Sequence, residues 1–185
     1  MASIRVISGK ARGRRLHSVP GDKTRPITDR TKEALFNIIG SDIEGAKMLD
    51  LFAGTGAVGI EALSHGAEYV RFVDIQRLAI QTINKNLKLT GLNEGAQVIK
   101  QNAFVLLEST PDVEFDYIYI APPQYKQYWQ KALLTLDKHP EWMATDAWVI
   151  VQIDPVEYQQ MGFKNMYVFD QRRYGSTLLV FLTTR

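Results

Sequence analysis

Short apolar runs and amphipathic stretches succeed one another along most of the chain. Runs of apolar, β-branched and aromatic residues predict strands, and the stretches between them have helical periodicity. The predicted strands are 47–52, 69–73, 96–100, 115–120 and 147–153. The predicted helices are 57–65, 76–89, 103–109 and 127–138. Strands that alternate with helices predict right-handed crossovers and therefore a mostly parallel sheet.

The N-terminal part of the chain follows another pattern. Residues 4–7 and 14–17 predict a small β-hairpin with a basic turn. Thr28 is placed to cap a helix that runs to about Ile39, with one buried apolar stripe. The stripe consists of Ala34, Leu35, Ile38 and Ile39.

The C-terminal part ends in a pair of strands. After a short predicted helix near 156–161, two further runs at 166–170 and 176–183 are joined by a tight link. Such a link predicts an antiparallel pair, which does not belong to a simple repeat of strand and helix. We therefore expect an N-terminal extension, 1–40, and an α/β domain, 41–185.

Composition limits the possible chemistry. The 185 residues are 45% hydrophobic, which suits one globular domain with a small appendage. Cysteine is absent, which excludes disulfides, a thiolate nucleophile and cysteine-bound metal centres. The three histidines are scattered without metal-site spacing, so no metal is expected. No apolar run reaches membrane-spanning length and no secretory signal is present, so we expect a soluble monomer in the cytoplasm, or in a plastid stroma after removal of a transit peptide.

Charge is spread unevenly along the chain. The net charge is +2, but residues 1–32 hold nine basic and two acidic side chains, which leaves −5 for the rest. A basic arm of this kind predicts binding to a polyanion, although a solubilising terminus explains the charge equally well. The candidate RNA-binding residues are Lys10, Arg12, Arg14, Arg15, Arg25 and Arg30.

A glycine-rich turn follows the first predicted strand of the domain. Gly54, Gly56 and Gly59 fit the pattern G-x-G-x-x-G, and Asp74 lies 20 residues after Gly54, at the end of the next strand. Glycines let the backbone approach a ligand, and the carboxylate can hold ribose hydroxyls. The pattern fits NAD or S-adenosylmethionine, and it also occurs in loops that only pack a strand on a helix. Asp50 suits an amino-acid ammonium better than a pyrophosphate, which favours S-adenosylmethionine.

Asn102 and Ala103 follow the third predicted strand of the domain. The amide of Asn102 can pair with the edge of an adenine ring or cap the helix that starts at Ala103, and the two roles are compatible. The candidate cofactor-binding residues are Thr28, Asp50, Phe52, Gly54, Gly56, Asp74, Ile75, Asn102 and Ala103.

A rigid corner follows the fourth strand. It consists of Ala121, Pro122, Pro123, Gln124 and Tyr125, which are the candidate catalytic residues. The two prolines fix φ and supply no N–H, so the carbonyls of the corner can accept hydrogen bonds from a substrate amine without competition. Tyr125, or Tyr128 nearby, can stack on an extruded base. The simpler interpretation is that the prolines end a strand and the aromatic side chains belong to the core.

These motifs together resemble a known family. The chain is similar from end to end to the bacterial small-subunit ribosomal RNA guanine-N2 methyltransferases. The resemblance depends on VISGKARGRRL (6–16), RPITDR (25–30), LDLFAGTGAVGIEALSHGA (49–67) and the Pro-Pro corner. It implies a Rossmann-like class I methyltransferase fold, with a seven-stranded mostly parallel sheet and an antiparallel C-terminal hairpin. It also implies S-adenosylmethionine as the methyl donor. The implied acceptor is the exocyclic amine of one guanine in 16S rRNA, within the small ribosomal subunit or its assembly intermediate.

The corner departs from the family pattern. Family members carry Asp-Pro-Pro followed by Tyr or Phe, whereas here Ala121 replaces the acid and Gln124 the aromatic residue. A charge-assisted hydrogen bond contributes about 1.5–3 kcal/mol, so its loss predicts a rate roughly ten- to a hundredfold lower. Three hypotheses follow: an active methyltransferase with a weakened corner, a non-catalytic cofactor- and RNA-binding assembly protein, and a small NAD-dependent oxidoreductase.

Overall fold

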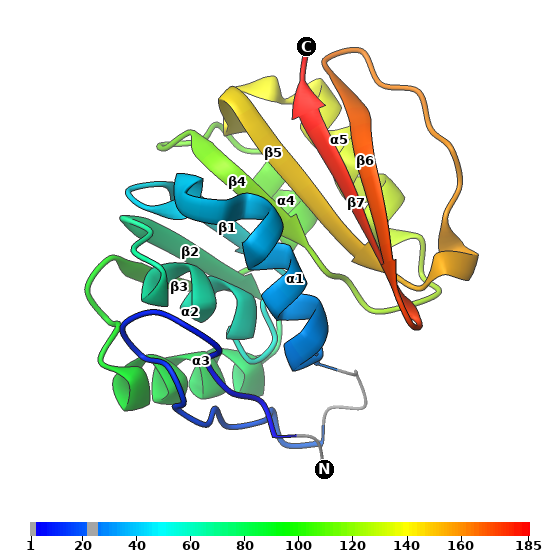
Figure 1. The fold of residues 1–185 in the computed structure, drawn as a ribbon. Helices are drawn as coiled ribbons and strands as arrows, with labels where there is room; N and C mark the ends of the chain where they lie inside the picture. The colour runs from blue at the N-terminus through cyan, green and yellow to red at the C-terminus, as the bar shows by residue number, and fades with distance from the viewer. Residues whose placement is uncertain (1–2, 22–25) are drawn as a thin grey trace.

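The computed structural model describes residues 3–21 and 26–185, which fold around one seven-stranded sheet (Figure 1). The strand order is β3-β2-β1-β4-β5-β7-β6. Strands β1 to β5 pair in parallel, and β7 pairs antiparallel with both β5 and β6. The strands are β1 Lys47–Leu51, β2 Tyr69–Asp74, β3 Ala96–Lys100, β4 Phe115–Ile120, β5 Met143–Ile153, β6 Met166–Tyr174 and β7 Thr177–Thr184. The predicted mostly parallel sheet with its C-terminal hairpin is confirmed.

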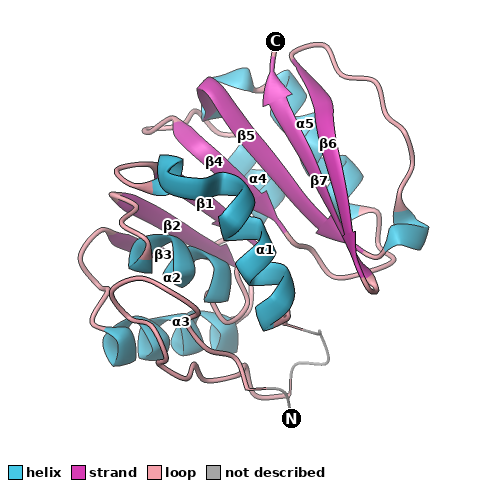
Figure 2. Ribbon diagram, viewed as in Figure 1, coloured by secondary structure: helices cyan, strands magenta, loops and turns pink. Residues whose placement is uncertain are grey.

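Helices cover both faces of the sheet (Figure 2). Helices α1, α2 and α3 share one apolar core with one face, and α4 and α5 share a second core with the other. The helices are α1 Asp29–Ile39, α2 Ala57–Ser64, α3 Arg77–Thr90, α4 Ala103–Leu107 and α5 Tyr128–Lys138. Three short 3-10 turns are η1 Gly40–Ile43, η2 Pro140–Trp142 and η3 Pro155–Glu157. No helix in the described ranges is both long and apolar enough to cross a membrane.

Local sequence explains where the helices begin and how closely they pack. Thr28 caps α1, because its Oγ1 accepts a hydrogen bond from the amide of Thr31 at 3.2 Å. Gly59 lets α2 lie directly on β2, since a Cβ at this position would be 2.3 Å from Cε1 of Phe72. The third glycine of the motif is therefore needed for helix–strand packing rather than for ligand contact.

The N-terminal segment forms less regular structure than predicted. Its antiparallel pairing contains one isolated bridge, between Arg5 and Arg15, instead of two regular strands. Flanking backbone bonds join Leu16 to Ile4 at 2.7 Å and Val6 to Arg14 at 2.9 Å. Four buried side chains of this segment, Ile4, Val6, Ala11 and Leu16, belong to the same core cluster as β1, β2 and α2.

The sequence predictions were wrong in two places near the C-terminus. The predicted helix near 156–161 is the single turn η3, and most of the predicted link at 171–175 belongs to β6. β6 lies at the edge of the sheet, and its second half, from Gln171 to Tyr174, is polar and mostly exposed, which is why this half was predicted as a link rather than a strand. β5 also begins earlier than predicted, through an irregular stretch in which Asp146 has φ 59°.

Candidate active site

The glycine loop and the proline corner leave neighbouring strands at the same edge of the sheet. Leu51, the last residue of β1, pairs with Ile120 of β4 on one side and with Val73 of β2 on the other. The strand order reverses between β1 and β4, and ligands of open α/β sheets bind at this switch point, outside the carboxyl ends of the strands. The two segments therefore begin side by side at this edge, because both follow directly after paired residues.

Backbone strain marks this edge. Phe52, Tyr125 and Gln127 have φ of 59°, 61° and 56°, and they are three of the four non-glycine residues with positive φ in the described ranges. Such conformations persist where the surrounding structure holds them, and they cluster at functional sites.

Asp74 holds the glycine loop in shape. Its Oδ2 accepts a hydrogen bond from the amide of Gly54 at 2.9 Å, and its Oδ1 accepts from the amide of Gln76 at 2.9 Å. Each carboxylate oxygen can accept a second bond, so Asp74 can brace the loop and still bind hydroxyls. Gly54 has φ 57°, and a Cβ built on it would meet no described atom within 4 Å. The backbone of the loop is therefore open to approach on this side.

Asp50 is a buried carboxyl beneath the same loop. Its Oδ2 accepts from the amide of Gly59 at 3.1 Å, and 2% of the residue is exposed. Burial raises the pKa of Asp50 well above its ordinary value, the Gly59 N–H opposes this shift, and the charge of Asp74 adds to it. A cationic ligand group at this place would favour the ionised carboxylate. Asp50 thus fits the predicted ammonium of S-adenosylmethionine.

Two polar neighbours of Asp50 lie on the next strands. Tyr119 is its register partner in β4, and the Tyr119 hydroxyl donates a hydrogen bond to Oε1 of Gln152. Burial raises the pKa of Tyr119, and the negative charge of Asp50 raises it further. The phenol therefore stays neutral and serves as a donor.

The predicted adenine side of the site is an open rim. Asn102 caps α4, since its Oδ1 accepts from the amide of Phe104 at 2.9 Å, and the predicted cap is confirmed. This bond uses the oxygen of the side chain, so an adenine contact through the NH2 group stays a prediction. Ile75 is 59% exposed, while Ala103 is buried at the start of α4.

The corner is held by the turn that follows β5. The amide of Tyr125 donates to Oε1 of Glu157 at 2.7 Å, and its hydroxyl donates to Oδ2 of Asp154 at 3.0 Å. Ala121 is half-buried and its methyl group cannot accept a hydrogen bond, and Gln124 is exposed. Neither acid was predicted as a site residue, because their contacts with Tyr125 span about thirty residues of sequence.

An aromatic wall lies between the glycine loop and α5. The ring of Phe104 is 5.8 Å from that of Phe52 and 5.4 Å from that of Tyr128. Two lysines lie over this cluster: Nζ of Lys131 is 4.3 Å from the Phe104 ring, and Nζ of Lys126 is 5.9 Å from the Tyr128 ring. Of these residues, Phe52 and Tyr128 were considered from sequence, as a candidate cofactor-binding residue and a candidate base-stacking residue, whereas Phe104 and the two lysines were not.

Glu61 and Ser64 of α2 fix the backbone of the basic arm. The amides of Ile7 and Ser8 each donate to the Glu61 carboxylate at 3.0 Å, and that of Ala11 donates to Oγ of Ser64 at 2.9 Å. Lys32 completes this cluster with Nζ 3.1 Å from Oε2 of Glu61, and both side chains are 1% exposed. Among the predicted RNA-binding residues, Lys10, Arg12, Arg14, Arg15 and Arg30 are exposed, and Arg25 lies outside the described residues.

Asn86 joins the arm to the glycine loop. This fully buried amide donates to the carbonyls of Thr55 at 2.9 Å and of His17 at 3.1 Å, and accepts from the amide of His17 at 2.7 Å. Neither Glu61 nor Asn86 was predicted, because each contacts residues more than thirty positions away.

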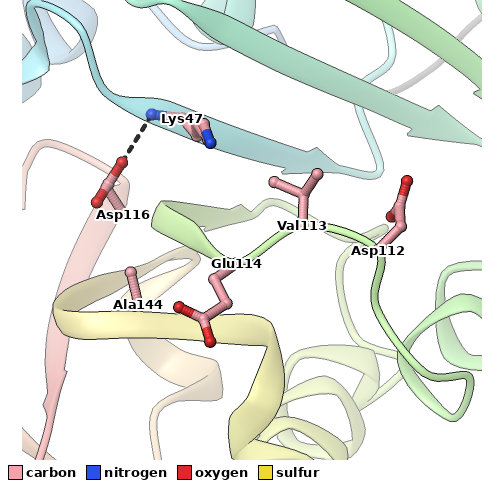
Figure 3. Close-up of a pocket in the computed structure, with 6 residues that line it drawn as sticks. All are labelled: Lys47, Asp112, Val113, Glu114, Asp116 and Ala144. Carbon is pink, nitrogen blue, oxygen red and sulfur yellow. Dashed lines mark hydrogen bonds between the residues drawn. The ribbon is translucent and has the colours of Figure 1, made fainter.

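A separate depression lies at the opposite edge of the sheet (Figure 3). It has a volume of about 360 Å³, and the amide of Lys47 donates to Oδ2 of Asp116 at its wall. The other lining residues are Asp112, Val113, Glu114 and Ala144. Because Lys47 opens β1, this depression lies at the amino ends of the strands and does not belong to the site.

Comparisons with known proteins agree with this geometry. A family model described as conserved hypothetical protein 95 matches residues 4–183. A Bacillus subtilis protein named as a candidate rRNA methyltransferase, YlbH, is 44% identical, over 82% of this chain and 83% of its own. Ribosomal RNA small subunit methyltransferase D of Escherichia coli K12 is 34% identical, over 80% and 74% of the two chains. A solved Escherichia coli structure described as a candidate methyltransferase, yhhF, has a TM-score of 0.87 at 29% identity and covers 98% of its length and 99% of this chain.

The fold and the site define a Rossmann-like methyltransferase. The match over residues 4–183 carries the assignment further. The chain belongs to the family of methyltransferase D and its relatives.

Proposed function

We propose that this chain transfers a methyl group from S-adenosylmethionine to the exocyclic N2 amine of a guanine in small-subunit ribosomal RNA. The pairing of Leu51 with Ile120 is the observation that supports it, because this register sets the glycine loop beside the Pro-Pro corner, at the edge where open α/β sheets bind ligands. The names of two relatives, which specify ribosomal RNA, support the substrate class.

The residues that would hold the cofactor come from three neighbouring strand ends. The glycine loop and Asp74 would accept the adenosine half, Asn102 and Ile75 the adenine ring, and Asp50 the ammonium group. When bound, S-adenosylmethionine supplies an electrophilic methyl group on a sulfonium.

The corner would orient the acceptor nitrogen. A guanine amine is a weak nucleophile, because its lone pair is delocalised into the ring, so alignment with the methyl–sulfur bond matters most. The carbonyls of Ala121 and Pro122 would accept the amine hydrogens, and the aromatic wall with Tyr128 would pack on an extruded base.

The basic arm would bind phosphates beside this cleft. Its exposed cations project from a backbone that Glu61 fixes, so they act from a defined position rather than as a loose tail. We propose that residues 1–40 are the RNA-gripping extension and residues 41–185 the cofactor-binding domain. The protein would act as a monomer.

A second candidate function is supported by Ala121. A chain that binds cofactor and RNA without turnover would serve as an assembly protein, and the missing acid at the corner favours this alternative. Tritiated methyl transfer to small subunits that lack the modification separates the two. Incorporation supports the enzyme, and its absence at stoichiometric enzyme, with cofactor and RNA still bound, supports the assembly protein.

A further inference from the structure

Glu157 carries an unused carboxylate oxygen beside the corner. Its Oε1 accepts from the amide of Tyr125, while Oε2 is buried and has no hydrogen-bond partner among the described residues. It is the one buried side-chain polar atom of this kind in the described ranges. Burying such an atom without a partner is unfavourable, and native proteins contain few of them, so each one calls for an explanation.

The neighbouring acid, Asp154, has a hydrogen bond at each of its carboxylate oxygens. Oδ1 of Asp154 accepts from the amide of Val156 at 3.0 Å, and its Oδ2 accepts from the hydroxyl of Tyr125 at 3.0 Å. Each oxygen of Asp154 thus already accepts one hydrogen bond from the turn or the corner. Oε2 of Glu157 accepts none from the described residues.

The position of Glu157 follows from strand register. Ile120, which precedes the corner, pairs with Val151 of β5, and Glu157 lies in the turn that follows β5. The carboxylate thus approaches the corner from the strand next to it. Ala121 has no acceptor on its side chain, and Glu157 brings a carboxylate from this neighbouring strand to Tyr125, the last residue of the corner.

We propose that Glu157 is a further catalytic residue, whose Oε2 accepts a hydrogen bond from the guanine amine held at the corner. This inference rests on the proposed function. The amine lone pair forms the new nitrogen–carbon bond while the carbon–sulfur bond breaks, and the electron pair of that bond stays on sulfur. The surplus proton on nitrogen passes to the Glu157 carboxylate and then to water. The negative charge of Glu157 also stabilises the positive charge that develops on nitrogen.

The alternative is a purely positioning role. The bond from Tyr125 fixes a residue with φ 61°, and a neutral acceptor performs that task as well as a charged one. Glu157→Gln keeps an oxygen for this amide and removes the charge, whereas Glu157→Ala removes both. The two substitutions therefore separate the roles.

The test is single-turnover methyl transfer to unmodified small subunits at saturating S-adenosylmethionine, with four variants. These are Glu157→Gln, Glu157→Ala, Ala121→Asp and the double variant Ala121→Asp/Glu157→Gln, with exposed Glu94→Gln as the matched control. We expect Glu157→Gln to lower the rate about ten- to a hundredfold, with unchanged affinity for S-adenosylhomocysteine, and Glu94→Gln to match wild type. In the Ala121→Asp background the same change should lower the rate by less than about threefold, because a second carboxylate is present.

A wild-type rate for Glu157→Gln, with a loss in Glu157→Ala, would overturn the inference and assign a positioning role. An equal loss of rate from Glu157→Gln in the wild-type and the Ala121→Asp proteins would also overturn the inference. If the wild-type protein transfers no methyl group, the proposed function fails, and this inference fails with it. If the wild-type protein transfers the methyl group and Glu157→Gln is equally fast, only this inference fails.

Discussion

Leu51 of β1 and Ile120 of β4 are register partners in neighbouring parallel strands, and each is the last residue of its strand. One therefore delivers the glycine loop and the other the Pro-Pro corner to a single edge. Under the proposed function, this relationship would bring the methyl donor and the acceptor base together.

Asp74→Asn should weaken cofactor binding. The change removes the charge and one of two acceptors that brace Gly54 and Gln76. We expect the affinity for S-adenosylhomocysteine to fall about ten- to a hundredfold in isothermal calorimetry, since bonds to a charged group contribute about 1.5–3 kcal/mol. Asp146→Asn, at an exposed residue near the amino end of β5, is the control. Equal affinities in the two variants would contradict the role of Asp74.

Asp50 should make cofactor binding depend on pH. Its pKa is raised in the folded protein, so the fold holds this proton more tightly than the unfolded chain does. The contribution of Asp50 to the stability of the fold is therefore fully present below the ordinary carboxyl pKa, and it is lost as pH rises through the raised pKa of Asp50. A bound ammonium group favours the ionised carboxylate of Asp50. The affinity for S-adenosylmethionine should therefore rise as pH rises through the raised pKa of Asp50, and binding below that pKa should release a proton. Calorimetry in buffers of different ionisation enthalpy measures the release, which Asp50→Asn should abolish.

Gly59→Ala should destabilise the fold although the residue is in a helix. The added Cβ would be 2.3 Å from Phe72 and 2.8 Å from Val70, and such overpacking costs about 1–3 kcal/mol. Gly162→Ala is the matched control, because its Cβ would meet no described atom within 4 Å and its φ is unstrained. Urea unfolding compares them, and equal midpoints would show that α2 and β2 are less closely packed than described.

Lys32→Met should lower the free energy of unfolding and loosen the basic arm from α2. The substitution leaves the Glu61 carboxylate buried without its cation, which costs about 3–5 kcal/mol. Adding Glu61→Gln should recover part of this loss. Chemical denaturation measures the stability, and limited proteolysis within residues 3–21 measures release of the arm. If the free energy of unfolding of Lys32→Met lies within about 1 kcal/mol of the wild-type value, Lys32 and Glu61 do not form a tight buried pair.

Removing charge from the arm should change the salt dependence of RNA binding. Each lost phosphate contact reduces the slope of log affinity against log salt by about one. Arg12→Ala and Arg14→Ala are therefore expected to lower both affinity and slope in filter binding to small-subunit RNA. Lys164→Ala removes an exposed cation from the loop before β6 and serves as the control. Identical slopes in the arm and control variants would favour the solubilising role.

Local pattern predicted much of the fold and part of the site. Alternating strands and helices, the cap at Thr28 and the glycine turn are set by neighbouring residues, and all were found as predicted. β6 was partly missed, because a polar edge strand lacks the apolar signal that marks buried strands.

The supporting contacts of the site were not predictable in the same way. Glu61 binds the arm from 53 and 54 positions away, and Glu157 reaches Tyr125 across 32. Such pairs depend on tertiary packing and leave no periodic mark in one sequence. The one available signal was position: acids just after a strand end, such as Asp154, gather at the ligand edge of a parallel sheet.

The most direct test of the meeting of donor and acceptor is the identity of the methylated nucleoside. Unmodified small subunits are incubated with wild-type protein and methyl-labelled S-adenosylmethionine, and the RNA is digested for chromatography and mass spectrometry. Label in N2-methylguanosine, at one site, is the predicted result. Label in another nucleoside, or none with enzyme in excess, would contradict it.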